Sequence, residues 1–322
     1  MYQTETLQKG EGGNGAACRL PYLDFLKGVL ILLVISFHLV YFEALHPYAK
    51  QVVYTFHMPA FLFISGFLVN INKPVRAFLR SMLWIAIPYA IMESGYTIAA
   101  SMLPVSDHVD NLSVLVFLDK LFLHPLGPYW YLHTILVCGL LSRFAMLVRR
   151  HWAVSVAVLA LAYWLISLSP LSLSLPCALY YLAGFALRRS GRPFASFFGA
   201  TPFAILGFVF LAMFPANLDK IAVGGIAMVY LSVSSLLWIY SVAGNKLSLV
   251  SYFGRKSLLL YVFSPVFTLA AKVMVPWLSF DPTGLLFLVL ALVLSVAGSL
   301  AVGCVLDALH LSPYIFGRKV MR

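Results

Sequence analysis

The feature that most constrains this chain is a series of apolar segments, each long enough to span a bilayer, that recur along nearly its whole length. A run of about 17 to 25 mainly apolar residues crosses a hydrocarbon core that is about 30 Å thick. The 322 residues are 62% hydrophobic and 10% charged, and their mean hydropathy is +0.93. Soluble domains are less apolar than this. The sequence therefore predicts a polytopic membrane protein.

The apolar segments predict about ten transmembrane helices. Backbone groups that face lipid need hydrogen-bond partners within their own segment, and the segments lack the alternating pattern of membrane barrel strands. The predicted spans are 22–41, 52–70, 80–100, 130–148, 152–168, 171–187, 202–214, 221–242, 257–278 and 284–306. The seventh span is the shortest, and its length also fits a re-entrant or buried segment. The predicted fold class is an all-α membrane protein.

The distribution of positive charge orients the predicted helices. If the N-terminus is cytoplasmic, 18 of the 22 Lys and Arg residues fall on the inner side. The four on the outer side are Lys50, Lys120, Lys220 and Lys272. Because cytoplasmic loops collect Lys and Arg, we expect ten spans with both termini cytoplasmic. The net charge of +11 then orients the protein and meets anionic lipid, so we expect the bilayer and no nucleic acid as a partner.

The domain organisation is simple. Residues 1–19 form a polar, Gly-rich stretch without the apolar core of a secretory signal, and we expect a cytoplasmic tail. Residues 20–322 are expected to form a single polytopic membrane domain. The four cysteines are scattered without metal-ligand spacing, so no metal site is predicted.

Three ionisable residues interrupt the apolar spans. His38 in "LILLVISFHLVYF" lies near the outer end of the first span, His57 in "FHMPAFLFISGF" lies early in the second, and Glu93 lies within the third. Straight helices of alternating direction bring these three residues to a similar depth. Groups that transfer protons would then share one layer of the membrane. The alternative is structural, since membrane histidines and carboxylates also hydrogen-bond neighbouring helices.

A cation precedes the first histidine at a helical spacing. Lys27 and His38 are eleven residues apart, which is about three turns on one helix face and roughly 16 Å. This arrangement suits an extended anionic donor whose charged end stays cytosolic while its reactive end reaches into the membrane. A lysine at an inner helix end also snorkels to headgroups without any other role.

Several stretches resemble one known family. "LDFLKGVLILLVISFH" followed by "FHMPAFLFISGFL" resembles the opening of the type-3 integral-membrane acyltransferases, bacterial proteins that mostly O-acetylate surface sugars. "RSMLWIAIPYAI", "GPYWYLHTIL", "YYLAGFALRR" and "YFGRKSLLLYVFSPVF" are similar to later helices of that family. Lys27 and His38 match its functional cation and histidine. Many members carry Arg at the first position, and they often carry His where this chain has Ser264.

The resemblance implies a reaction and a location. It implies transfer of acetyl from cytoplasmic acetyl-coenzyme A to a hydroxyl of a cell-surface glycan or its lipid-linked precursor, in the bacterial cytoplasmic (inner) membrane. The phosphorylated end of the donor cannot enter hydrocarbon cheaply, so it is expected among inner-face cations. Lys27, Arg76 and Arg80 are the predicted donor-binding residues, with Arg255 and Lys256 behind them.

The predicted catalytic residues are the three intramembrane groups. His38 is expected to be the general base toward the acceptor hydroxyl, with His57 as its partner and Glu93 orienting one imidazole. An acyl-histidine intermediate is the alternative chemistry. The long outer loop 101–129 is expected to shape the acceptor surface or to form an interfacial helix. The competing function is a transporter or flippase for a glycan or lipid-linked sugar, although the sequence has no inverted repeat.

Overall fold

The computed structural model describes residues 20–102, 108–145, 152–171, 173–318 and 320–321. The predicted tail, residues 1–19, lies outside this range. Helices and their connections make up the described residues, which contain no β-strand. The α-helices are α1 Pro21–Ser36, α2 Val40–Leu45, α3 Pro47–Leu68, α4 Val75–Met102, α5 Val114–Phe122, α6 Trp130–Ala145, α7 Trp152–Ser167, α8 Leu175–Arg189, α9 Phe194–Phe198, α10 Phe203–Ala212, α11 Val223–Ala243, α12 Ser248–Arg255, α13 Ser257–Ala270, α14 Val275–Leu278, α15 Leu285–Ala308 and α16 Ser312–Ile315. The short 3₁₀ helices are η1 Gly127–Tyr129, η2 Pro215–Asn217, η3 Gly244–Leu247 and η4 Ala271–Met274.

Each of the ten predicted spans contains a helix, but their lengths differ. Among the described residues, five helical segments are long and apolar enough to cross a membrane: α3, α4, α11, α15 and the unit Ser257–Leu278. The helices of the other five predicted spans have 10 to 16 residues. The protein is thus a helical membrane protein, while ten crossings with both termini cytoplasmic stay a prediction.

The first helix is shorter than predicted. We expected it to extend to residue 41 and to carry His38, whereas α1 ends at Ser36 and His38 lies in the turn before α2. The ring of His38 bonds back to the last turn of α1. Its Nδ1 lies 2.7 Å from the carbonyl oxygen of Val34, the oxygen that the backbone N–H of residue 38 would bind in a continued helix. That N–H instead binds Ile35 in a tighter turn.

Two other spans also depart from simple crossing helices. At 1.5 Å per residue, the 10 residues of α10 extend about 15 Å, which is half of a hydrocarbon core. The ninth span is helical throughout, but η4 separates α13 from α14. Pro276 lies at the start of α14, where its missing N–H costs no hydrogen bond.

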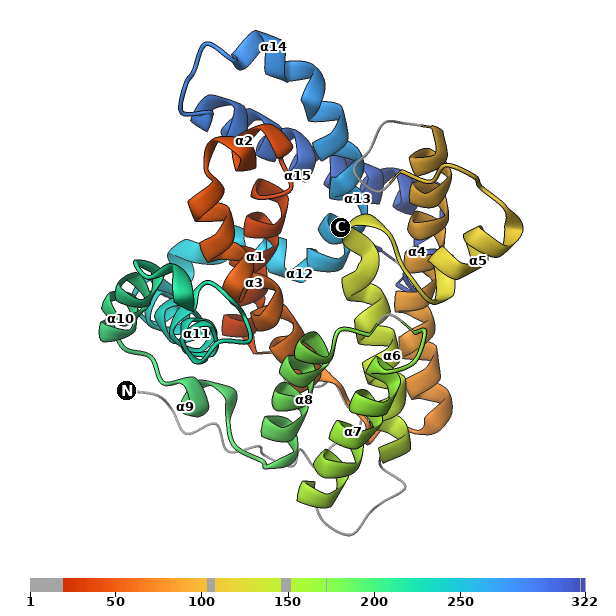
Figure 1. Cartoon of the computed structure of the whole chain (residues 1–322), viewed down its shortest axis with the longest axis vertical. Coiled ribbons are helices and arrows are strands. Elements are labelled where there is room, and N and C mark those ends of the chain that lie inside the picture. The colour runs from red at the N-terminus through yellow and green to blue at the C-terminus, as the bar shows by residue number, and fades with distance from the viewer. Residues whose placement is uncertain (1–19, 103–107, 146–151, 172, 319, 322) are drawn as a thin grey trace.

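Helix α3 lies at the centre of the molecule (Figure 1). The most apolar window of α3 is 72% buried, against 17% for α4, so α3 is enclosed by protein and α4 forms an edge. A methyl group at Gly66 would overlap the carbonyl oxygen of Tyr181 on α8, and one at Gly184 would overlap that of Phe63 on α3. Small residues thus allow the two backbones to approach closely.

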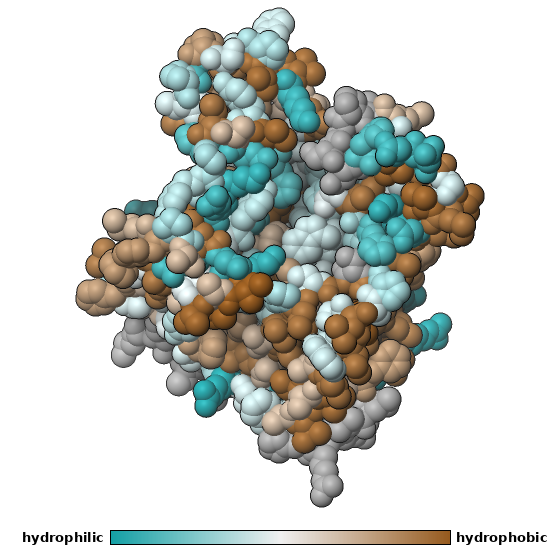
Figure 2. Space-filling view, in the orientation of Figure 1, coloured by the Kyte–Doolittle hydropathy of each residue, from teal (hydrophilic) through white to brown (hydrophobic). Residues whose placement is uncertain are grey.

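The remaining helices pack around this centre. α1 packs against α12 and α3, α13 against α15, and α10 against α11. In Figure 1, α2 and α5, which belong to connections predicted to be external, and α14, at the predicted outer end of the ninth span, lie in the upper half of the view. Figure 2 shows hydrophilic residues gathered on the upper half of this face and apolar residues dominating the lower half.

The long outer connection contains a helix. α5 begins after Ser113, whose side-chain oxygen accepts a 3.2 Å hydrogen bond from Val116 N–H. None of the residues of α5 is buried. The helix expected in loop 101–129 is therefore present, and residues 103–107 of that loop lie outside the described range.

Candidate active site

The structure brings His38 and His57 into one cavity of about 170 Å³, here called the histidine cavity. His57 projects from α3, and His38 from the turn after α1. The remaining lining residues come from six parts of the chain and are Val34, Tyr54, Met58, Pro59, Pro128, Trp130, Cys177, Lys220 and Tyr261.

Both imidazoles are held in the same way. Nδ1 of His38 lies 2.7 Å from the carbonyl oxygen of Val34, and Nδ1 of His57 lies 2.6 Å from that of Val53. A carbonyl oxygen only accepts hydrogen bonds, so Nδ1 carries the proton in each ring. In the neutral form, Nε2 of each ring therefore holds the lone pair, which is the tautomer that a general base needs.

Nε2 of His57 is available to a substrate. His57 is 2% exposed, and within the described residues its Nε2 has no hydrogen-bond partner. A buried polar atom without a partner costs about 1–3 kcal/mol. Such a cost is common where a site is completed by its substrate.

Tyr54 lies beside both imidazoles. Its ring centroid is 5.2 Å from that of His57 and 6.3 Å from that of His38. Its hydroxyl donates a 2.9 Å hydrogen bond to the carbonyl oxygen of Phe37, in the turn that carries His38. Tyr54 therefore couples the α1–α2 turn to α3.

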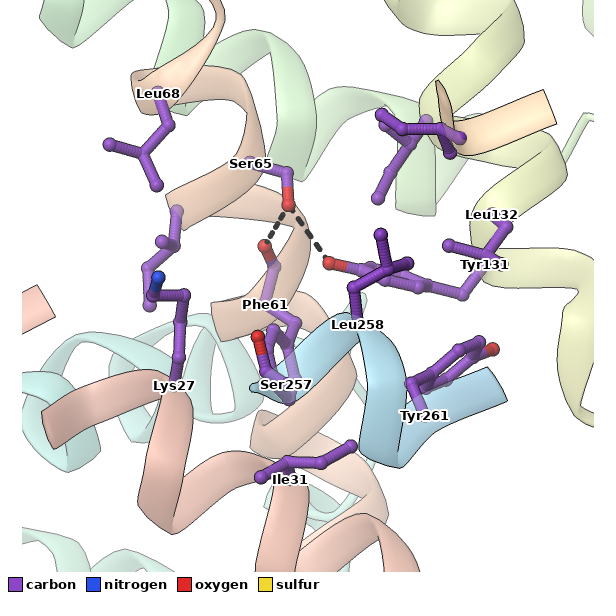
Figure 3. Close-up of a pocket in the computed structure, with 13 residues that line it drawn as sticks. Lys27, Ile31, Phe61, Ser65, Leu68, Tyr131, Leu132, Ser257, Leu258 and Tyr261 are labelled. Carbon is purple, nitrogen blue, oxygen red and sulfur yellow. Dashed lines mark hydrogen bonds between the residues drawn. The ribbon is translucent and has the colours of Figure 1, made fainter. Parts of the chain in front are cut away.

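A second cavity of about 170 Å³ contains Lys27 and is here called the Lys27 cavity (Figure 3). Its wall is largely apolar, and its polar groups are Lys27, Ser65, Ser257 and the hydroxyls of Tyr131 and Tyr261. Ser65 Oγ donates a 2.9 Å hydrogen bond to the carbonyl oxygen of Phe61 and accepts one of 2.9 Å from Tyr131. Ser65 thus lines this cavity and joins α3 to Tyr131 on α6.

A third cavity of about 260 Å³ adjoins the second and is here called the Lys73 cavity. The two share Ser65, Leu68, Ile85 and Ile135 as lining residues. Its polar lining includes Lys73, whose Nζ donates a 3.0 Å hydrogen bond to Ser81 Oγ.

Tyr261 links the histidine cavity to the Lys27 cavity, because it lines both. Its hydroxyl donates to the carbonyl oxygen of Pro128, while Tyr129 donates a 3.1 Å hydrogen bond to the carbonyl oxygen of Val262. This reciprocal pair of bonds joins α13 to the segment before α6. Tyr261 thus forms a wall that the two cavities share.

Lys27 carries a neighbouring countercharge. Its Nζ lies 2.9 Å from Oδ1 of Asp24, three residues earlier on α1. This ion pair offsets part of the positive charge that a phosphorylated donor would meet. Lys73 lines its cavity beside a neutral hydroxyl instead.

The other predicted donor-binding cations lie away from these cavities. Arg76 and Arg80 are exposed on α4, and neither lines any of the three. Lys256 donates to the carbonyl oxygen of Met321 and lies over the ring of Tyr252. Partial burial lowers the pKa of Lys256, and the positive charge of Arg318 lowers it further.

Glu93 contacts a loop rather than an imidazole. It is fully buried on α4, and its Oε1 accepts a 2.6 Å hydrogen bond from Leu126 N–H. The segment after Leu126 includes Pro128 and Trp130, which line the histidine cavity. Both imidazoles bind backbone carbonyls through Nδ1 instead. Glu93 thus supports the cavity wall through Leu126, and its predicted orientation of an imidazole stays a prediction.

Sequence reasoning missed four lining residues: Tyr54, Lys73, Lys220 and Tyr261. Tyr54 precedes His57 by three residues, so a search of the same helix face finds it. Lys220 was recognised only as an outer lysine. Tyr261 carries no local signal, because its position depends on how α13 packs. The described residues contain no group of three His, Cys, Asp or Glu side chains that could hold a metal ion.

The fold is that of a helical membrane protein. In its candidate site, two imidazoles that bind backbone carbonyls line the histidine cavity, which shares Tyr261 with the Lys27 cavity. The chain belongs to the type-3 acyltransferase family, since the family model, described as an acyltransferase domain, matches residues 20–304. It is 29% identical over 177 residues to nodulation protein NolL of Sinorhizobium fredii, covering 51% of this chain and 47% of that protein. It is 28% identical over 197 residues to nodulation protein NolL of Mesorhizobium japonicum, covering 54% and 48%.

The chain spans about half the length of the curated relatives it matches. No solved structure shows a significant match to it.

Proposed function

We propose that this protein is a membrane-embedded O-acyltransferase of the bacterial inner membrane. It transfers acetyl from cytoplasmic acetyl-coenzyme A to a hydroxyl of a cell-surface glycan or its lipid-linked precursor. Family membership supports the reaction type. The observation that carries the proposal is the common tautomer of His38 and His57, which directs the basic Nε2 of each ring away from its backbone anchor.

The donor enters through the Lys73 cavity and the Lys27 cavity. The largely apolar walls of the two adjoining cavities suit a narrow pantetheine arm, and the hydroxyls of Ser65 and Tyr131 offer partners for its amides. The nucleotide phosphates stay among the cations of the inner face. The thioester then lies near Tyr261, which lines both the Lys27 cavity and the histidine cavity.

Transfer proceeds by general base catalysis. Nε2 of His38 accepts the proton of the acceptor hydroxyl, whose oxygen forms a bond to the thioester carbonyl carbon. The carbon–sulfur bond then breaks, and the leaving thiolate takes a proton from an imidazolium. His57 positions the acceptor or donates a hydrogen bond to the developing oxyanion through Nε2 when it is protonated. The products are the acetyl ester and free coenzyme A.

Transfer of labelled acetyl tests this function. Membranes with matched amounts of wild type, His38→Ala and His108→Ala are given labelled acetyl-coenzyme A. His108 is an exposed histidine outside the three cavities and serves as the matched control. We expect His38→Ala to lose about 100-fold or more of the label transfer and His108→Ala to keep it. Full transfer by His38→Ala would refute the role of His38, and no transfer by wild type would refute the function.

A further inference from the structure

We propose that Lys220 makes this site selective for an acceptor with an anionic group, a carboxylate or a phosphate, near the accepting hydroxyl. The inference rests on the proposed function and adds to it the chemical class of the acceptor.

Lys220 belongs to the histidine cavity. It lies between η2 and α11, and it lines the cavity together with His38, His57 and Tyr54. Its ammonium is near enough to the His57 imidazole to act on it electrostatically. A ligand that contacts the two imidazoles therefore lies close to a positive charge.

The position of Lys220 is fixed by its backbone. Tyr180 on α8 donates a 2.6 Å hydrogen bond to the carbonyl oxygen of Lys220. The neighbouring Asp219 accepts a 3.0 Å hydrogen bond from Ile221 N–H, which closes the turn that leads into α11. These bonds hold the loop against α8, so the lysine is part of a built wall.

Lys220 lacks the countercharge that two other outer lysines, Lys50 and Lys120, have. Nζ of Lys50 lies 3.1 Å from Glu43, and that of Lys120 lies 3.6 Å from Asp119. Within the described part of the chain, Lys220 makes no ion pair, although its side chain is partly buried. A partly desolvated ammonium is stabilised by a bound anion.

The acidic groups around the cavity have partners of their own. Glu43 acts electrostatically on His38, and its carboxylate is paired with Lys50 and lies 3.4 Å from the Tyr54 hydroxyl. The carboxylate of Asp219 accepts the hydrogen bond from Ile221 N–H. Within the described residues, the cavity thus carries the positive charge of Lys220, which makes no ion pair, beside two imidazoles. Uronic acid carboxylates and the phosphates of lipid-linked sugars both have the complementary charge.

Equilibrium binding of three sugar probes tests the inference. The purified full-length protein, in a maltoside detergent without phosphate, is titrated with p-nitrophenyl glucuronide, glucose 1-phosphate and the neutral p-nitrophenyl glucoside. We expect at least one anionic probe to bind about tenfold more tightly than the neutral one, because a charge-assisted hydrogen bond is stronger than a neutral one. Preference for one anion identifies whether a carboxylate or a phosphate is recognised.

Three variants test whether Lys220 is the source of the anion preference. Lys220→Met should remove it, while Lys272→Met, which changes an exposed outer lysine outside the three cavities, should keep it. Lys220→Arg should restore it, since a guanidinium keeps the charge. Absence of an anion preference in wild type, or a preference that survives in Lys220→Met, would overturn the inference. Label transfer by wild type is measured in parallel, so these results are separable from failure of the proposed function.

Discussion

The rings of Tyr54 and His57 lie 5.2 Å apart on the same face of α3, inclined at 33° to each other. The Tyr54 hydroxyl also reaches the carbonyl oxygen of Phe37, next to His38. One tyrosine thus contacts both imidazoles and the turn that carries one of them. The relative placement of the two proposed catalytic groups depends on it.

Replacement of Tyr54 separates these contacts. Tyr54→Phe should keep the ring packing and lose the bond to Phe37, which contributes about 0.5–1.5 kcal/mol, so we expect kcat to fall a few-fold. Tyr54→Ala should also remove the ring packing against His38 and His57, and we expect it to lower kcat about 10- to 100-fold. Steady-state kinetics with labelled acetyl-coenzyme A measures both. Equal kcat for all three proteins would show that Tyr54 does not position the imidazoles.

The lysines that line the Lys27 cavity and the Lys73 cavity should determine the affinity for acetyl-coenzyme A. We expect Lys73→Met to raise the KM for acetyl-coenzyme A about tenfold with little change in kcat, because a lost phosphate contact costs about 1.5–3 kcal/mol. Lys27→Met should have a smaller effect, because Asp24 already offsets its charge. Arg80→Met provides the control of an exposed cation on α4. A larger KM change in Arg80→Met than in Lys73→Met would place the phosphates along α4 instead.

Glu93 should act through the loop that it binds. Glu93→Ala removes the acceptor of Leu126 N–H, at a cost of about 1–3 kcal/mol, and should loosen the wall formed by Pro128 and Trp130. We expect a lower kcat and a lower unfolding temperature. Glu93→Gln keeps an oxygen acceptor and should recover most of both. If Glu93→Gln has the low kcat of Glu93→Ala but the unfolding temperature of the wild type, the charge of the Glu93 carboxylate takes part in the chemistry.

Close packing of α3 against α8 should be sensitive to one methyl group. Gly66→Ala places that group on the carbonyl oxygen of Tyr181, and we expect a loss of about 1–3 kcal/mol of stability. A methyl group at Gly95 on α4 would meet no atom within 4 Å, so Gly95→Ala should be neutral or stabilise by up to about 1 kcal/mol. Thermal unfolding in detergent compares the two variants. Equal unfolding temperatures would contradict this account of the α3–α8 contact.

The amino-acid sequence alone determined the helical membrane fold and the family. Helix formation in lipid depends on the apolar length of each segment, which is a local property, and each of the ten predicted spans contains a helix. The motifs around Lys27, His38 and His57 are contiguous, so the family resemblance could be read directly, and the family match over residues 20–304 confirms it.

The tertiary structure decided how the site is built. α1 ends at Ser36, which places His38 in the turn before α2, and the Tyr54 hydroxyl on α3 binds that turn at Phe37, a contact that no hydropathy pattern encodes. Whether a cation lines a cavity or faces outward depends on the rotation and tilt of its helix, which are set by contacts between distant segments. Those contacts place Lys73 and Lys220 in cavity walls and leave Arg80 outside the three cavities. The sequence thus specified which groups are available, and packing between helices determined which of them meet.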